Sequence, residues 1–181
     1  SQSEARYQMA SGGPIPTGTT DAMTLEAWIK PESQDPNGYY AIMAQQTASD
    51  DNWGTSRIWF GMKGGILHFI LGTPSTFPQA KIPDNAWTHV AVTVSGTNTA
   101  TVKIYIDSQL VYFYNNWSRT ALGSYFAVGA SPQLNDYDWL GDLDQVKIWN
   151  SALSEDEIRA SMNAYQAPGT GNAIASNLKV H

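Results

Sequence analysis

The stretch from Leu140 to Ile158 reads LGDLDQVKIWNSALSEDEI and joins a strand pattern directly to the start of a helix. Its first half alternates between two sets of residues, which predicts a β-strand with two distinct faces. The residues predicted to share one face are Leu143, Gln145, Lys147 and Trp149. The residues predicted on the opposite face are Asp144, Val146 and Ile148. This strand carries two carboxylates, Asp142 and Asp144, where a charge is costly unless it is paired or bound to a metal.

The second half of the same stretch predicts a helix over about residues 155–165. Ser154 is a favourable N-cap, and Glu157 stands at the position that completes a capping box with it. Leu153 and Ile158 flank the cap at the two positions of a hydrophobic staple. We therefore expect one short helix near the C-terminal end of the chain.

The rest of the chain reads as short alternating segments separated by turns rich in Gly, Pro, Asn and Asp. This pattern predicts an all-β antiparallel sandwich or barrel. The sequence contains no internal repeat, and its composition does not change along the chain in a way that would mark a second domain. Residues 1–181 are therefore predicted to form a single domain. We assign Trp28, Trp87 and Trp149 to packing, and His89 to a hydrogen-bonded position at the edge of a strand.

Composition narrows the function further. The net charge is −6 and the isoelectric point is near 4.8, which argues against nucleic acid or an anionic membrane as a partner. No apolar run approaches the roughly 18 residues of a membrane span, so no membrane insertion is expected. The absence of cysteine excludes disulfides, thiolate metal sites and a cysteine nucleophile. An acidic surface suits neutral ligands and calcium, which prefers carboxylate oxygens.

Five segments in this order and spacing resemble the laminin-G-like, pentraxin-related branch of the concanavalin-A-like jelly rolls. They are TLEAWIKP (Thr24–Pro31), WTHVAVTVSG (Trp87–Gly96), VKIYIDSQLV (Val102–Val111), FAVGAS (Phe126–Ser131) and GDLDQVKIWNSALSEDEI (Gly141–Ile158). The resemblance implies a two-sheet antiparallel jelly-roll sandwich with glycan-binding or adhesive function. It also implies frequent use of calcium, and a secreted or cell-surface location.

Pentraxins place their calcium ligands on two loops, which correspond here to Thr47–Thr55 and Ala130–Asp138. Early in the second loop, where pentraxins carry acids, this chain has Ser131, Pro132 and Gln133. The double calcium site of the pentraxins is therefore not carried over intact. A single calcium site with a different set of ligands is the alternative that the sequence allows.

The same two loops stand out from their chemistry alone. The first carries Asp50, Asp51, Asn52 and Trp53, and the second carries Asn135, Asp136, Tyr137, Asp138 and Trp139. Carboxylates and amides are hard oxygen ligands for calcium, and aromatic rings offer faces for the C–H groups of a sugar. We predict Asp50, Asp51, Asp136 and Asp138 as metal ligands, and expect the two loops at the same end of the sandwich. The alternative interpretation is that each loop is a solvated turn.

Asp142 and Asp144 form an alternative, structural calcium site, because strand alternation places both carboxylates on one face. The competing interpretation is that the two carboxylates accept hydrogen bonds from loop backbone, or from Lys147 or Arg159.

Some concanavalin-A-like proteins hydrolyse glycans with carboxylates spaced as E-x-D-x-x-E, and this pattern is absent. The sequence thus predicts a non-catalytic, lectin-like domain that binds glycans or glycoconjugates with the help of calcium. Two alternatives remain: a structural or protein-binding adhesion module with a structural calcium, and a glycoside hydrolase or lyase.

Overall fold

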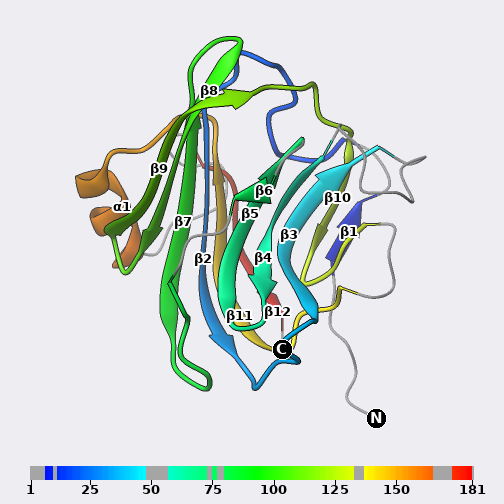
Figure 1. Cartoon of the computed structure of the whole chain (residues 1–181), viewed down its shortest axis with the longest axis vertical. Coiled ribbons are helices and arrows are strands. Elements are labelled where there is room, and N and C mark those ends of the chain that lie inside the picture. The colour runs from blue at the N-terminus through cyan, green and yellow to red at the C-terminus, as the bar shows by residue number, and fades with distance from the viewer. Residues whose placement is uncertain are drawn as a thin grey trace.

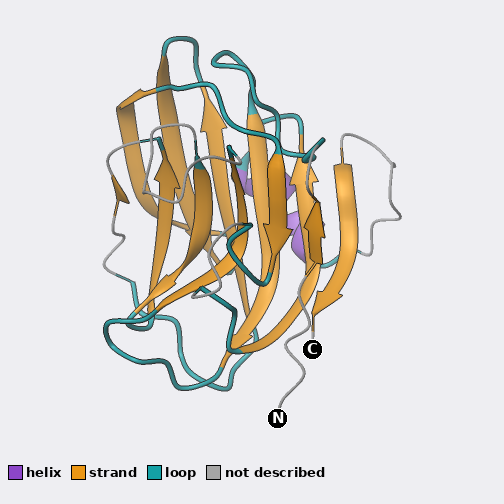
Figure 2. Ribbon diagram, turned by 90° about the vertical axis from the view of Figure 1, so that its right-hand side faces the viewer, coloured by secondary structure: helices purple, strands orange, loops and turns teal. Residues whose placement is uncertain are grey.

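Two antiparallel sheets stack face to face and confirm the predicted sandwich (Figures 1 and 2). The structure is a computed structural model that describes residues 7–9, 12–47, 57–72, 75–76, 80–132, 137–164 and 173–180. Sheet A consists, in spatial order, of β1 (Tyr7–Met9), β10 (Tyr125–Val128), β3 (Tyr39–Gln46), β4 (Ile58–Lys63), β5 (Ile66–Leu71) and β6 (Ser75–Thr76). Sheet B consists of β12 (Ala173–Val180), β11 (Gly141–Trp149), β2 (Met23–Pro31), β7 (Thr88–Ser95), β8 (Thr99–Ile106) and β9 (Gln109–Ser118). The short helix α1 (Glu155–Met162) lies against the outside of sheet B (Figure 1).

The core lies between the sheets and follows from the alternation of the strands. In β2, Leu25, Ala27 and Ile29 are fully buried in it, as their spacing predicts. Burying a side chain of the size of Leu or Ile stabilises the folded state by roughly 1.5–3 kcal/mol. No helix in the described part of the chain is long and apolar enough to cross a membrane.

The predicted alternation of β11 fails in the middle of the strand. Asp144 lies opposite Trp28 and Lys147 lies opposite Glu26, so β11 uses one residue more than β2 over this interval. Gln145 is the residue beside this β-bulge and has a φ of +47°. The bulge reverses the faces that follow it: Val146 joins Leu143 and Ile148 in the core, and Lys147 turns to the outside of sheet B.

Helix α1 begins as the sequence predicts. The Ser154 backbone N–H donates to the Glu157 carboxylate at 2.7 Å, and the Glu157 backbone N–H donates to the Ser154 hydroxyl at 3.3 Å. This capping box satisfies two of the backbone N–H groups that a helix start leaves unpaired. Leu153 packs against the buried cluster that contains Ile158, which is the predicted hydrophobic staple.

A buried carboxylate holds α1 to sheet B. Glu26 has no exposed surface, and its Oε1 accepts a hydrogen bond from Trp149 Nε1 at 2.9 Å and another from the Ser161 hydroxyl. Its Oε2 lies 3.3 Å from His89 Nε2, and Lys147 Nζ lies 3.7 Å from Oε1. Burial raises the pKa of Glu26, but these contacts outweigh burial and bring the pKa below its ordinary value. The carboxylate is therefore charged.

The same cluster ends the helix. Lys147 Nζ donates to the backbone carbonyls of Ser161 at 2.6 Å and Ala164 at 3.2 Å. Trp28 Nε1 donates to the Met162 carbonyl at 3.1 Å. These donors satisfy carbonyls that the last helical turn leaves without partners, and the ammonium opposes the negative end of the helix dipole.

Two expectations about single residues are wrong. His89 is not an edge residue, because β7 is an inner strand of sheet B and the imidazole is buried beside Glu26. Trp87 is not packed but 47% exposed, because it precedes β7 and lies outside the ladder. Trp28 and Trp149 do pack, on the outer face of sheet B.

Replacing Glu26 with Gln should lower the free energy of unfolding by about 3–5 kcal/mol, because it leaves the Lys147 ammonium buried without its counter-charge. The double variant Glu26→Gln/Lys147→Met should lose less than the sum of the two single variants. Urea unfolding at neutral pH measures all three values.

The matched control is Glu155→Gln, which removes an exposed ion pair with Arg159 and should cost no more than about 0.5 kcal/mol. Strictly additive losses at positions 26 and 147 would contradict a coupled buried cluster.

Candidate functional site

An aromatic patch, made of Tyr39, Trp59 and Tyr137, lies on the outer face of sheet A. The rings of Tyr39 and Tyr137 stand edge to face with their centres 5.4 Å apart, and Tyr39 stands in the same way 6.1 Å from Trp59. Trp59 is 1% exposed, whereas the two tyrosines are half-buried. The patch therefore presents tyrosine rings to solvent over a buried indole.

Lys63 adds a charge to this patch. Its ammonium lies 4.5 Å above the centre of the Tyr39 ring and donates a hydrogen bond to the Tyr39 hydroxyl at 2.7 Å. The position over the ring is that of a cation–π contact. The Tyr39 ring is thereby fixed between Lys63, Trp59 and Tyr137, which gives it one well-defined orientation.

Backbone hydrogen bonds place the second acidic loop beside this patch. The Tyr137 carbonyl accepts from the Ala41 N–H in β3, and the Trp139 N–H donates to the Gly129 carbonyl, both at 2.9 Å. Tyr137 thus comes from the predicted loop and joins residues of β3 and β4 that the sequence analysis did not connect with it. Asp138 follows it and is half-buried.

Trp139 does not belong to a binding surface. Only 8% of its surface is exposed, and its ring is part of the main core between the sheets. The prediction that Trp139 stacks on a sugar is therefore wrong. Strand alternation would place Tyr137 and Trp139 on the same side, but residues 137–140 are not in a strand, and the chain turns Trp139 inward before β11 begins.

The expectation that the two acidic loops leave the sandwich at the same end is also wrong. β3 and β10 are antiparallel, with Tyr125 opposite Gln46 and Val128 opposite Met43. The first loop follows the end of β3 and the second follows the end of β10, so they leave this strand pair at opposite ends. The antiparallel pairing of β3 with β10 determines the end at which each loop leaves, and the sequence alone does not show which strands pair.

Six of the predicted ligand-binding residues lie outside the described residues. They are Asp50, Asp51, Asn52, Trp53, Asn135 and Asp136. Of the four predicted metal ligands, Asp138 is the one whose position is described. Calcium takes about six to eight oxygen ligands, so Asp138 is suited to supply one of a larger set.

Asp142 and Asp144 do lie on one face of β11, on either side of the buried Leu143. Asp142 Oδ2 pairs with Lys30 Nζ at 3.1 Å across the strand pair, and Asp144 Oδ1 accepts from the Gln145 backbone N–H at 2.7 Å. These contacts agree with the hydrogen-bonding interpretation, with Lys30 as the cation in place of Lys147 or Arg159. Across the described ranges, no group of three or more His, Cys, Asp or Glu side chains is arranged to hold a metal ion.

One further titratable group lies on the same face of sheet A. His68 in β5 pairs with Gly61 in β4 and is 4% exposed. Burial, together with the positive charge of Lys63, lowers the pKa of His68 to about 4. The imidazole is therefore neutral at physiological pH.

Comparisons with known proteins agree with the fold. A family model described as the concanavalin A-like lectin/glucanases superfamily matches residues 4–159. A search of curated proteins finds no match.

Three solved structures illustrate the shared fold. A candidate carbohydrate-binding protein of Bacteroides ovatus has a TM-score of 0.72 and 17% identity, over 95% of this chain and 49% of that chain. The native heptameric SAP-like pentraxin of Limulus polyphemus has a TM-score of 0.63 and 17% identity, over 98% and 91%. Domain 4 of AbnA, an extracellular GH43 arabinanase of Geobacillus stearothermophilus solved with arabinotriose, has a TM-score of 0.57 and 22% identity, over 82% and 68%. The chain thus spans about half the length of the Bacteroides protein.

Acidification should destabilise the chain through His68. An unfolded histidine has a pKa near 6.5, and the folded value is about 4, so between these values the unfolded state binds a proton that the folded state does not. The free energy of unfolding should therefore fall as the pH falls from about 6.5 towards 4. Urea unfolding at a series of pH values measures this slope.

His68→Gln should flatten the profile in the upper part of this window. Lys63→Met should reduce the slope less, because it removes one of two causes of the low pKa. An unchanged slope in His68→Gln would show that other groups produce it.

Proposed function

The chain belongs to the concanavalin A-like lectin/glucanase superfamily, and we propose that it is a non-catalytic domain that binds glycans or glycoconjugates. The observation that carries this proposal is the aromatic patch, in which the half-buried rings of Tyr39 and Tyr137 are held in fixed orientations, with Asp138 directly after Tyr137 in the chain. The fold shared with the Bacteroides ovatus protein and with the arabinanase domain supports it.

The chemistry of the patch suits a sugar ring. A tyrosine ring contacts the apolar C–H groups of one face of the sugar, while its hydroxyl bonds to water or to a sugar hydroxyl. A carboxylate such as that of Asp138 accepts hydrogen bonds from sugar hydroxyls, and the Lys63 ammonium, which bonds to the Tyr39 hydroxyl, is a donor. Because these rings are already packed, little side-chain freedom is lost on binding.

Calcium belongs to the proposal as a bridging ion. Its support is the acidic composition of each loop. Because the two loops leave the β3–β10 pair at opposite ends, one ion would take its carboxylates from one loop, either Asp136 and Asp138 or Asp50 and Asp51. In that role the ion would connect loop carboxylates to vicinal hydroxyls of the ligand, and the patch would supply the apolar contact.

The absence of catalysis is likewise a proposal. The one glutamate in the middle of a described strand, Glu26, is buried beneath α1 and bonded to Trp149 and Ser161. It is therefore out of reach of a substrate and cannot act as one of the two carboxylates of a glycosidase. We further propose a secreted or cell-surface location, which the extracellular arabinanase neighbour supports.

A glycan array probed with the chain in calcium and in chelator tests the function. We expect binding to at least one glycan, and about tenfold weaker binding by Tyr137→Ala, which corresponds to about 1.4 kcal/mol of lost ring contact. Tyr114→Ala is the matched control, because this tyrosine is 42% exposed on β9 of the other sheet.

If no glycan on the array binds in either buffer, the proposal is wrong. Equal loss in both tyrosine variants would indicate damage to the fold rather than to a site. Binding of the same strength in chelator would remove calcium from the proposal and leave the rest.

Calcium should also act on stability in a residue-specific way. Because Asp142 and Asp144 lie on β11 outside both acidic loops, Asp142→Asn and Asp144→Asn should leave any calcium-induced rise in melting temperature unchanged. Asp138→Asn should diminish that rise. Differential scanning calorimetry with and without calcium measures it, and loss of the rise in the Asp142 variant would move the site to β11.

One observation favours the second candidate function, a protein-binding adhesion module. The edge strand β9 exposes Leu110, Val111, Phe113 and Tyr114, each by 39–53% of its surface. An apolar edge strand is a surface on which another protein adds a strand. In that case Phe113→Lys would abolish partner binding, and no glycan would bind.

A further inference from the structure

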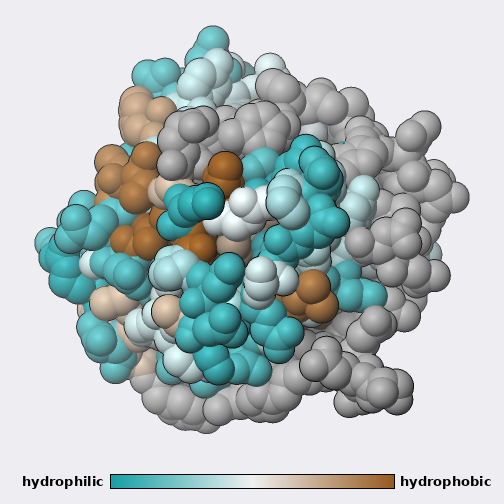
Figure 3. Space-filling model, turned by 60° about the horizontal axis from the view of Figure 1, so that its bottom comes forward, coloured by the Kyte–Doolittle hydropathy of each residue, from teal (hydrophilic) through white to brown (hydrophobic). Residues whose placement is uncertain are grey.

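A pocket of about 440 Å³ lies at the end of the sandwich where β2 turns into β3 and β4 turns into β5. Figure 3 shows this end of the molecule, whose described surface is mainly hydrophilic with small apolar groups. The pocket has the volume of a small-ligand site, which is roughly 300–1,000 Å³. Its lining residues are Gln34, Pro36, Gly64, Gly65, Lys81, Ile82, Pro83 and Asp84.

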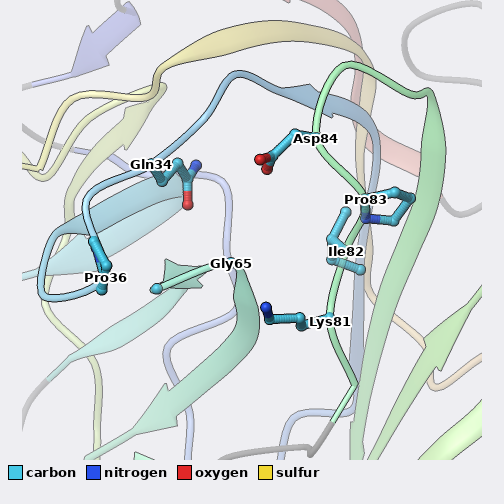
Figure 4. A pocket seen from close by; sticks show the side chains of 8 residues that line it. Gln34, Pro36, Gly65, Lys81, Ile82, Pro83 and Asp84 are labelled. Atoms are coloured by element: carbon cyan, nitrogen blue, oxygen red, sulfur yellow. The ribbon is translucent and has the colours of Figure 1, made fainter.

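Gln34 points to a missing ligand. Both its side-chain nitrogen and its side-chain oxygen are buried, and neither has a hydrogen-bond partner among the described residues. A buried carboxamide without partners is costly, since it gives up its bonds to water and gains none. Figure 4 shows this amide directed into the hollow. Both atoms are covered in this structure, so a ligand in the pocket would reach the donor and the acceptor after a rotation of the Gln34 side chain.

Two charged groups face the same space. Figure 4 shows the Asp84 carboxylate and the Lys81 ammonium reaching into the hollow from the loop that precedes β7, opposite Gln34. A carboxylate only accepts hydrogen bonds, and an ammonium only donates them. The opposite charges cancel, so the pocket as a whole favours an uncharged ligand over an ion.

The walls are held in place before any ligand arrives. The Ile82 N–H donates to the Gly65 carbonyl at 2.9 Å, and the Asn85 N–H donates to the Pro31 carbonyl at 2.7 Å. Gly64, at a φ of +57°, approaches Pro36 so closely that a Cβ would lie 2.6 Å from its carbonyl oxygen. The β4–β5 turn is therefore tied to both neighbouring segments, and such preorganisation reduces the entropy lost on binding.

On the Gln34 turn, the Asp35 N–H donates to the Tyr40 hydroxyl at 3.0 Å, and the Asn37 N–H donates to the Asp35 carboxylate at 2.7 Å. These bonds fix the backbone after Gln34, and the Glu32 N–H, which donates to the Leu140 carbonyl at 3.0 Å, fixes it before Gln34. The polar groups of the pocket therefore come from segments that cannot easily move to satisfy them.

We propose that this pocket binds one neutral sugar residue, the terminal unit of a glycan, end-on. The inference rests on the proposed function and deepens it. Sugar hydroxyls are both donors and acceptors, so adjacent hydroxyls satisfy the Gln34 amide while others bond to Asp84 and Lys81. Pro36, Ile82 and Pro83 supply apolar contacts for the C–H groups. No aromatic ring lines the pocket, so recognition here rests on hydrogen bonds rather than on stacking along a chain.

The pocket adjoins the aromatic patch through the β4–β5 turn. Lys63, which bonds to Tyr39, directly precedes Gly64 of the pocket wall, and the Tyr39 backbone lies opposite Lys63 in the ladder. A glycan whose last residue occupies the pocket can therefore place its following residue towards Tyr39. The two sites then bind successive units of one ligand.

The test is a nuclear magnetic resonance titration of the whole chain with neutral methyl glycosides of glucose, galactose, mannose and arabinose. At least one glycoside should shift the side-chain amide signals of Gln34. Gln34→Leu and Asp84→Asn should each weaken that binding by about tenfold or more, since each leaves a sugar hydroxyl without its partner. Ser33→Ala and Glu32→Gln, on the same turn but outside the lining, should change it by less than about twofold.

A stability measurement separates binding from folding. Gln34→Leu should keep or raise the melting temperature, because it removes buried polar atoms that have no partner in the described structure. Asp84 is exposed, so Asp84→Asn remains a test of the pocket even if the Leu variant does not fold.

Other outcomes overturn the inference. If glycine shifts the Gln34 amide and no glycoside does, the pocket binds a zwitterion. If an array-positive glycan loses affinity in Tyr137→Ala but not in Gln34→Leu or Asp84→Asn, the pocket is no subsite, and the proposed function stands. If no glycan or glycoside binds anywhere, both the inference and the proposed function fall.

Discussion

The buried carboxylate of Glu26 is the constraint on which the outer layer of sheet B depends. A charge without exposed surface is tolerated only when every partner is present, and the partners here come from separate elements. β7 supplies His89, β11 supplies Lys147 and Trp149, and α1 supplies Ser161. A shift of any of these elements would leave a buried charge uncompensated. The carboxylate therefore selects one register of β11 and one docked position of the helix.

The β-bulge at Gln145 makes this arrangement possible. Without the extra residue, Lys147 would share the face of Leu143 and enter the apolar core. With it, the same strand contributes three core side chains and then presents a cation and an indole to Glu26. A local irregularity of the backbone, at a φ of +47°, thus reconciles an apolar face with a buried ionic cluster.

The Glu26 cluster occupies the outer face of sheet B, and the features that we propose for binding lie in other parts of the molecule. The polar and aromatic groups to which we assign ligand binding lie on sheet A and at the β2–β3 turn, remote from α1. There the side chains are held by turns and short hydrogen bonds rather than by burial, and several keep unsatisfied or half-exposed polar groups. Buried polar atoms without a hydrogen-bond partner also occur among the described core residues, at Gln46, Trp59 and Trp139, so Gln34 is one of several such side chains.

Some of the candidate site could be anticipated from sequence. Tyr137 and Asp138 were identified because an aromatic next to an acid in a loop is a local signal. Trp139 was assigned wrongly, because a chain leaving a loop turns one side chain inward, and the sequence does not say which. Tyr39, Lys63 and Gln34 were missed because each is ordinary in its own segment and becomes informative only beside the others.

The sequence by itself determined the elements: strand alternation, turn residues and the capping box act between neighbours a few positions apart, so they are legible in one segment. It also determined the two-sheet architecture, because half-apolar strands must bury their apolar faces against each other. Only the tertiary structure decided the bulge in β11, the Lys30–Asp142 pair, the ends at which the acidic loops leave, and the pocket. Those features depend on register and direction between segments distant in the chain, where a shift of one residue exchanges the faces of a strand.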